Sequence, residues 1–406
     1  MPCTAPLSSI PPNEWPDPPE QMTVSALGEL EACPRRWALT WADYRGIWQG
    51  RGYPPQPRWK ALEGVVVHEA LSTLTSAFAR AGCSSLADAA VTEVMRNLGG
   101  LSGVLNDSID RIVLDLTQNP RASALLGYAD CWLRSQLPQL RVRVQTLLSM
   151  VSLAPFRRGK AAGVGKGRGA LSAGTYAEID LLVPRIAWRG RADLLVLSKE
   201  TCEIVEFKTG GPKDRDSFQV LVYALLWSRD IELNPRGTLA TQLTLAYPTG
   251  AVTVTPPCKA NLDVFERELV RRAQAARDTL QLHPPQARPR PDLCCSCSVR
   301  HLCDAFWAEE NQLLLPGSST KDEFTDAELE ITGQHGRFSW DAVSRRSRSL
   351  REGQVVILRT QGNRPSLQAG QRVRALNIQV MDTGGSSADP LLVNVGSLSE
   401  IFRVEC

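Results

Sequence analysis

Residues 190–210 read GRADLLVLSKETCEIVEFKTG, two apolar segments separated by the polar stretch Ser198–Thr201. Each apolar segment has the composition of a β-strand. Side chains alternate between the two faces of a strand, so Glu206 and Lys208 point to one face and Phe207 points to the other. Asp193 belongs to the preceding strand. The sequence therefore predicts that two carboxylates and an amine meet at the edge of a sheet.

Two carboxylates and an amine at a sheet edge are typical of a metal centre that handles phosphate. Carboxylate oxygens are the ligands that Mg²⁺ and Mn²⁺ prefer, and such sites keep open positions for water. The metal can bind a phosphate oxygen and acidify a water, while Lys208 orients that water or offsets charge on the phosphorus oxygens. The alternative is an exposed Glu–Lys pair of little energetic value. The E-x-K spacing alone favours that alternative.

Length and composition are those of a soluble globular protein. The chain has 406 residues, of which 43% are hydrophobic, which suffices for one large domain and a smaller one. No basic segment followed by an apolar core opens the chain, and no apolar run is long enough to cross a bilayer. We therefore expect a cytoplasmic protein without a membrane partner. Lys and Arg total 46 against 43 Asp and Glu, so a DNA-binding surface must come from local clustering.

Helical and strand-like patterns alternate along the chain and predict an α/β domain. Residues 1–20 are rich in proline and are expected to form an extended tail. Helical spacing begins at residues 24–41, with Ser25 as the candidate N-cap. Further helices are expected at 62–80, 215–230 and 261–282, and strands at 175–183, 190–198, 202–210 and 241–250.

The chain carries eleven cysteines, most of them isolated, and one tight cluster in PDLCCSCSVRHLC. Three members of the cluster have the spacing C-x2-C-x5-C: Cys294, Cys297 and Cys303. Three clustered thiolates with a distant fourth are typical of an iron–sulfur cluster, and Cys33 is the candidate fourth ligand. Cys295 and His301 lie inside the cluster and could substitute. The alternative is a small zinc site, with Cys33 an ordinary buried cysteine.

The C-terminal hundred residues have a different pattern. Residues 311–345 are expected to form a linker, and residues 346–406 show short β-rich runs separated by turn residues, which predict a small barrel-like domain. An OB-like barrel that binds single-stranded DNA is one interpretation. A barrel that docks a protein is the other, because the strands carry few aromatic residues on which bases could stack.

Five motifs follow one another in an order typical of a known superfamily. They are G-x-x-x-H at Gly64–His68, a glutamate at Glu178, G-x-x-D at Gly190–Asp193, E-x-K at Glu206–Lys208 and Q-x-x-x-Y at Gln219–Tyr223. With them, residues 24–307 resemble the PD-(D/E)XK nuclease superfamily, and most closely its RecB-like branch. Many members, including the AddB nuclease domain and CRISPR-associated RecB-like exonucleases, similarly have one cysteine before the histidine motif and three after the core.

The resemblance implies a restriction-endonuclease-like core over residues 21–310, a mixed sheet flanked by helices, with a helical N-terminal insertion. It implies that Mg²⁺ or Mn²⁺ is bound by three side chains: His68, Asp193 and Glu206. Lys208 would orient the attacking water. Gln219 and Tyr223, one helical turn apart, would contact DNA near the scissile phosphate. Without the motif order, the histidine would be an ordinary buried residue and the glutamine and tyrosine would be packing residues.

The resemblance also implies a 4Fe-4S cluster held by Cys33 and the three clustered cysteines. The function that follows is that of a metal-dependent deoxyribonuclease. The first hypothesis is a single-stranded DNA exonuclease that acts in repair, recombination or defence. A structure-specific endonuclease subunit of a helicase or CRISPR complex is the second hypothesis, and a non-catalytic iron–sulfur DNA-binding subunit is the third. The chain has no Walker motif, so unwinding would require a helicase partner.

Overall fold

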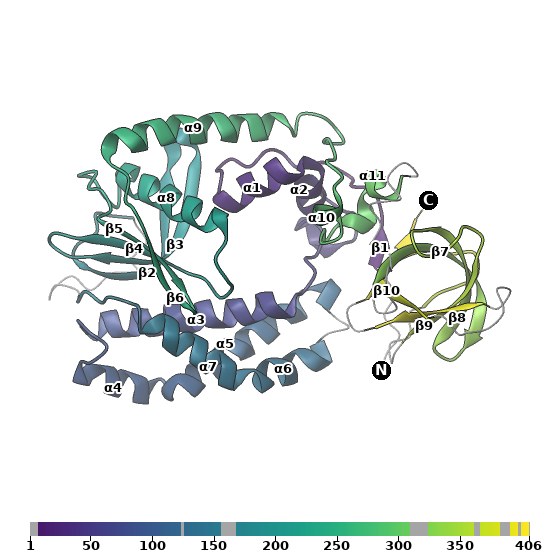
Figure 1. The fold of residues 1–406 in the computed structure, drawn as a ribbon, viewed down its shortest axis with the longest axis horizontal. Coiled ribbons are helices and arrows are strands. Elements are labelled where there is room, and N and C mark those ends of the chain that lie inside the picture. The colour runs from purple at the N-terminus through teal and green to yellow at the C-terminus, as the bar shows by residue number, and fades with distance from the viewer. Residues whose placement is uncertain are drawn as a thin grey trace.

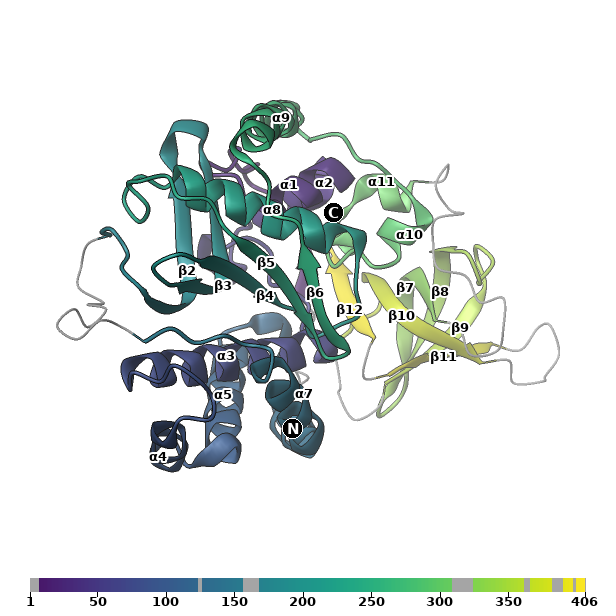
Figure 2. The same ribbon diagram turned by 60° about the vertical axis from the view of Figure 1, so that its left-hand side comes forward.

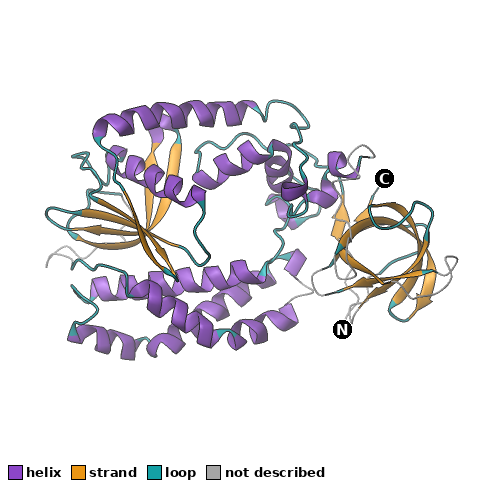
Figure 3. Ribbon diagram, viewed as in Figure 1, coloured by secondary structure: helices purple, strands orange, loops and turns teal. Residues whose placement is uncertain are grey.

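The computed structural model of the 406-residue chain describes residues 7–122, 126–155, 168–308, 324–360, 366–381, 390–396 and 399–405. Its helices are α1 (Val24–Ala32), α2 (Pro34–Trp41), α3 (Trp59–Arg80), α4 (Ala89–Asn97), α5 (Gly100–Thr117), α6 (Leu126–Ser135), α7 (Leu137–Leu148), α8 (Asp214–Arg229), α9 (Lys259–Asp278), α10 (Pro291–Cys294) and α11 (Asp304–Trp307). A larger body, made of helices around one sheet, lies beside a small β-barrel (Figure 1, Figure 3). Among the described helices, none combines the length and apolar character needed to cross a membrane.

The larger body is built around a five-stranded mixed sheet in the order β2-β3-β4-β5-β6. Its strands are β2 (Gly174–Val183), β3 (Trp188–Leu197), β4 (Cys202–Phe207), β5 (Gln242–Tyr247) and β6 (Gly250–Val254). All neighbours are antiparallel except β4 and β5, which run parallel because α8 crosses over between them. The prediction of a mixed sheet flanked by helices is confirmed.

Helices cover both faces of this sheet, as Figure 2 shows with α8 and α9 above it and α3, α5 and α7 below it. Alternation along β3 explains the two layers. Leu195 and Leu197 belong to the apolar core formed with α8 and α9, whereas Leu194 and Val196 belong to the core formed with α3, α5 and α7. Every residue of β4 is buried, so the strand that ends on the E-x-K motif lies at the centre of the fold.

The predicted first helix is divided in two at Cys33. Pro34 begins α2 and disfavours helical geometry at the residue before it, and Cys33 is accordingly extended, with φ −162° and ψ 104°. The N-cap of α1 is Thr23, whose Oγ1 accepts a hydrogen bond from the Ala26 amide at 3.1 Å, and the predicted N-cap Ser25 is wrong by two residues. The break leaves the Cys33 side chain at a junction between two helices.

The C-terminal part is a barrel made of β7 (Thr325–Gly336), β8 (Ser339–Ser347), β9 (Val355–Thr360), β10 (Arg372–Met381), β11 (Leu391–Val395) and β12 (Glu400–Val404). Its ring has the order β7-β8-β9-β11-β10 and closes where β10 pairs with β7. Strands β9 and β11 run parallel, and the other neighbours in the ring are antiparallel.

Two predicted boundaries differ from the structure. Strands β7 and β8 occupy 325–347, most of the described part of the predicted 311–345 linker, because alternate residues Ala327, Leu329 and Ile331 fill the barrel core. Residues 311–323 lie outside the described residues. In the predicted tail, β1 (Leu7–Ser9) pairs in parallel with β12. The barrel therefore contains both ends of the described chain.

Candidate active site and cysteine pocket

Three side chains from three elements gather beside the last residues of β4. They are His68 of α3, Glu178 of β2 and Asp193 of β3, and their ligand atoms all lie within 4.8 Å of one another. His68 Nδ1 lies 3.3 Å from Asp193 Oδ1. The other oxygen of Asp193 accepts a hydrogen bond from the Phe207 amide at 2.6 Å, which fixes the carboxylate against β4. An imidazole and two carboxylates in this arrangement form a ligand set for a divalent cation.

Glu178 joins this group through strand pairing. Its neighbours Ala177 and Ile179 pair with Leu194 and Ala192, so Glu178 faces Asp193 across the β2–β3 ladder. Its backbone is left-handed, with φ 50°, inside an otherwise extended strand. Such a conformation costs a non-glycine residue about 1–2 kcal/mol and is found chiefly at functional sites. The expected ligand set did not include Glu178, although the short turn between two strand-like runs could have placed it opposite Asp193.

The E-x-K and Q-x-x-x-Y motifs form one hydrogen-bonded network. Glu206 Oε1 accepts bonds from Lys208 Nζ at 3.0 Å and from Gln219 Nε2 at 2.7 Å. Gln219 also accepts a bond from Lys208 at 2.7 Å, and its Nε2 lies 2.7 Å from the Tyr223 hydroxyl. Glu206 is only 5% exposed. The alternative of a solvent-exposed Glu–Lys pair is therefore wrong.

The electrostatics of the site reflect several acids held close together. Burial, and after it the charge of Asp193, raises the pKa of Glu206 to about 8. Burial and then Asp193 also raise the pKa of Glu178. At His68, burial lowers the pKa, but the hydrogen bond and charge of Asp193 outweigh it, so the pKa is raised. The acids of the site thus carry more negative charge than His68 and Lys208 can balance.

The glycines of two motifs allow close packing around these groups. A Cβ atom on Gly190 would lie 2.7 Å from Tyr223 Cε1 and 3.0 Å from Leu226 Cδ1, so only glycine lets α8 approach β3 this closely. A Cβ atom on Gly64 would lie 3.1 Å from Thr209 Oγ1. The two glycines therefore let α8 approach β3 and let α3 approach the segment that follows β4.

A divalent metal fits the residues that are present. Glu206 Oε2 is buried and has no hydrogen-bond partner among the described residues, although a buried carboxylate oxygen normally has one. Two further acids and His68 lie beside it, and burial together with the charge of Asp193 raises the pKa of Glu178 and of Glu206. A bound cation would supply the missing partner and the missing positive charge.

The four predicted cluster cysteines line a single pocket at the far end of the larger body: Cys33, Cys294, Cys297 and Cys303. Cys33 comes from the junction of α1 and α2, and the other three lie around α10 and α11. Cys295 is exposed and His301 is buried against Phe402, at a ring-centroid distance of 3.6 Å, and neither lines the pocket. The pocket thus gathers thiols that are far apart in sequence.

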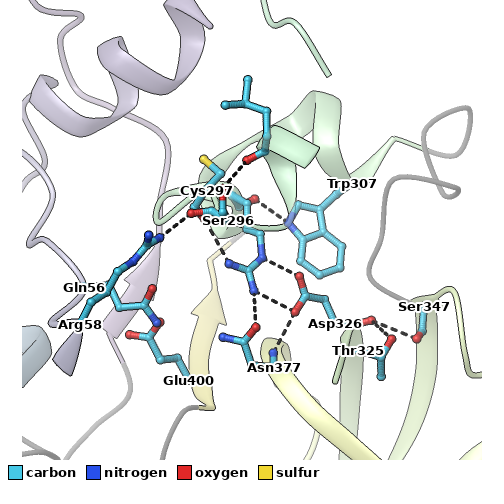
Figure 4. A network of polar contacts seen from close by, with 12 residues as sticks. Gln56, Arg58, Ser296, Cys297, Trp307, Thr325, Asp326, Ser347, Asn377 and Glu400 are labelled. Atoms are coloured by element: carbon cyan, nitrogen blue, oxygen red, sulfur yellow. Dashed lines mark hydrogen bonds and ion pairs between the residues drawn. The ribbon is translucent and has the colours of Figure 1, made fainter. Parts of the chain in front are cut away.

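The barrel holds the cysteine-bearing segment through buried polar contacts (Figure 4). Arg300 donates from Nε to Asp326 at 2.6 Å and from Nη2 to Asn377 at 2.9 Å. The indole of Trp307 donates to the Arg300 carbonyl at 2.9 Å. Arg121 of the larger body forms a second ion pair with Glu400 of β12 at 2.6 Å. Residues 294–307, which carry three of the pocket cysteines, therefore contact the barrel through Arg300, and Arg121 joins the larger body to the barrel directly.

Comparison with known proteins identifies the family. No curated protein matches the sequence. A solved structure of a murine DNA-binding protein bound to double-stranded DNA aligns with 58% of this chain and 96% of its own, at 6% identity and a TM-score of 0.16, a likeness too weak to bear on fold or function. The family model of the PD-(D/E)XK nuclease superfamily matches residues 21–304, which contain the sheet, the acids and the four pocket cysteines. The chain belongs to the PD-(D/E)XK nuclease superfamily.

Proposed function

We propose that this nuclease hydrolyses DNA with Mg²⁺ or Mn²⁺ and acts as an exonuclease on single-stranded DNA. The observation that carries the metal dependence is the joint placement of His68, Glu178 and Asp193 beside the unpartnered oxygen of Glu206. Single-strand and end preference rest on the RecB-like motif order, as does a role in repair, recombination or defence. A helicase partner would supply the free strand.

The chain's own side chains divide the work of phosphodiester hydrolysis. His68, Glu178 and Asp193 would hold the cation, and Glu206 would offer its Oε2 as a further ligand. A metal bound there lowers the pKa of a water and offsets charge on the phosphate. Lys208, fixed by Glu206 and Gln219, keeps its ammonium at the strand end, where it donates to the attacking water or to a phosphate oxygen. Tyr223 holds Gln219 in position.

The experiment that tests this function uses protein purified without oxygen. It is incubated with end-labelled single-stranded and double-stranded DNA, in Mg²⁺, in Mn²⁺ or in chelator, beside an Asp193→Ala variant. We expect metal-dependent release of short products from free single-stranded ends by the wild type only. Cleavage of closed circular single strands would favour the endonuclease hypothesis. DNA binding without cleavage in either metal would favour the non-catalytic one.

We also propose that the cysteine pocket holds a 4Fe-4S cluster. Support comes from the four thiols around one pocket. Burial raises the pKa of Cys294, Cys297 and Cys303, and Arg36 and Arg300 limit that rise at Cys297. Positive charge of this kind favours thiolates, which are the ligand form. Iron, sulfide and zinc analysis of anaerobic protein tests the proposal. Four irons per chain are expected, and one zinc with no iron would identify a zinc site.

A further inference from the structure

A buried acid outside the five motifs, Asp216, lies close to the proposed catalytic lysine, Lys208. Asp216 occupies the first turn of α8 and is 5% exposed. Its Oδ2 accepts hydrogen bonds from the Lys213 amide at 3.0 Å and from the Tyr247 hydroxyl at 2.9 Å. Its Oδ1 lies 3.9 Å from Lys208 Nζ. One oxygen is thus anchored, and the other faces the ammonium.

An acid in the first turn of a helix is ordinarily explained as a cap. Asp216 does accept the backbone bond of a capping box, but that bond uses Oδ2. The capping role explains neither the Tyr247 hydroxyl, which comes from the neighbouring strand β5, nor the approach of Oδ1 to Lys208. Tyr247 is 2% exposed, so this hydrogen bond is made inside the protein.

Lys208 needs an anion that the metal does not engage. In the structure its ammonium bonds to Glu206 Oε1 and to Gln219 Oε1. When Glu206 binds a divalent cation, the cation offsets the carboxylate charge and repels the ammonium. Gln219 is neutral and cannot replace that charge. Among the described residues, Asp216 is the other carboxylate that the structure pairs with Lys208.

We propose that Asp216, held by Tyr247, is a positioning residue that retains the Lys208 ammonium at the strand end once Glu206 is bound to metal. This inference rests on the proposed nuclease function. Asp216 lies outside the group of His68, Glu178 and Asp193 and acts through Lys208. Tyr247 and the Lys213 amide keep the Asp216 carboxylate from rotating, so Oδ1 stays directed toward the lysine.

The test compares kcat and KM for single-stranded DNA in Asp216→Asn, Tyr247→Phe and Asp214→Asn variants. Asp216→Asn keeps the shape of the side chain and removes its charge. We expect kcat to fall by up to about a hundredfold, the loss that follows when a reacting group is misplaced by about 1 Å. KM and the Mg²⁺ concentration for half-maximal rate should stay within about twofold, because the proposed role of Asp216 is to position Lys208 and not to bind DNA or metal. Tyr247→Phe should lower kcat less, in the same direction.

Asp214 is the matched control. It is an exposed acid in the same first turn of α8, so Asp214→Asn removes the same charge from the helix terminus without approaching Lys208. It should leave kcat unchanged. Thermal unfolding of each variant separates loss of rate from loss of fold.

The outcomes separate this inference from the function it rests on. Wild-type kcat in Asp216→Asn, with an inactive Asp193→Ala, would overturn the role of Asp216 and leave the nuclease intact. Equal losses in Asp214→Asn and Asp216→Asn, or a loss that appears in KM alone, would overturn it as well. Full activity in Asp193→Ala would remove the proposed active site and the positioning role together.

Discussion

The ion pair between Arg300 and Asp326 provides the sharpest test of how the barrel is attached. Arg300 is 2% exposed and Asp326 is fully buried. Asp326 accepts two bonds from the guanidinium, at 2.6 and 3.1 Å, and a third from the Asn377 amide at 2.8 Å. Changing Asp326→Asn keeps the size of the side chain but leaves a buried guanidinium without its counter-charge.

The expected loss of stability is large relative to the total free energy of unfolding. Removing one partner of a buried ion pair destabilises by about 3–5 kcal/mol. The Arg300 guanidinium keeps two acceptors, the Cys297 carbonyl at 3.1 Å and the Asn377 side chain at 2.9 Å, so the lower end, about 3 kcal/mol, applies. Total stabilities of folded domains are only about 5–15 kcal/mol. The loss should therefore be visible in any equilibrium measurement of unfolding.

The assay is urea unfolding followed by tryptophan fluorescence, with hydrogen exchange of residues 297–307. Trp307 is 1% exposed and bonds to the Arg300 carbonyl, so its emission should report the interface. The matched control is Glu268→Gln, which breaks an exposed pair with Arg271 on α9 and should leave the midpoint unchanged. A double change to Arg300→Met and Asp326→Leu should recover much of the loss.

The result that would refute this reasoning is specific. If Asp326→Asn and Glu268→Gln shifted the midpoint equally little, and exchange at 297–307 stayed slow, the barrel would not depend on this buried pair. The ion pair would then be a minor contact, and apolar packing of Leu376 and Phe402 against the larger body would have to account for the docking.

Four further predictions follow from the site and the pocket. Asp193→Ala and Lys208→Ala should abolish cleavage and leave DNA affinity nearly unchanged, as binding and turnover assays would show. Each should also lower the melting temperature, because Asp193→Ala removes the acceptor of the Phe207 amide and Lys208→Ala removes a cation from the buried Glu206. Glu206→Gln should also be inactive, yet metal-free protein should gain stability from it. Folding raises the pKa of the wild-type carboxyl from 4.5 to about 8, so the protonated group contributes to stability fully below pH 4.5, and that stability is lost as the pH rises through about 8. Melting temperatures of the variant, measured across this pH range, should lack that decline. Gly190→Ala should cost about 1–3 kcal/mol and lower kcat, because the added Cβ meets Tyr223 at 2.7 Å and displaces α8. Cys33→Ser should lower iron content, melting temperature and activity together, whereas the exposed Cys131→Ser should change none of them.

Much of the site could be anticipated because its residues follow local patterns. His68 lies on a helix whose buried residues follow helical spacing, and Asp193 and Glu206 lie in apolar runs that have the composition of strands. Motif spacing then indicated which of these side chains act together. Glu178 was noted from its motif position only, since its place opposite Asp193 depends on the register of β2 and β3.

Other features depend on contacts between distant parts of the chain. The barrel begins at Thr325 rather than at residue 346, and it includes Leu7–Ser9, because strand pairing is completed by partners far away in sequence. A deletion from Val355 onward would therefore cut the barrel between β8 and β9 and expose unpaired edges, so it cannot test the barrel's function cleanly.

The sequence by itself determined the class of the core, the order of the motifs and the residue types of both candidate centres, because periodicity and spacing are local properties. Only the tertiary structure decided that Cys33 rather than Cys295 or His301 shares the pocket, that Asp216 faces Lys208, and that Arg300 is buried against the barrel. The cysteine pocket closes a loop of more than 250 residues, the pair Arg300–Asp326 spans 26 residues, and Asp216 reaches Lys208 across the turn between β4 and α8. Which side chains meet after such closure is set by the packing of the whole chain, which no local pattern records.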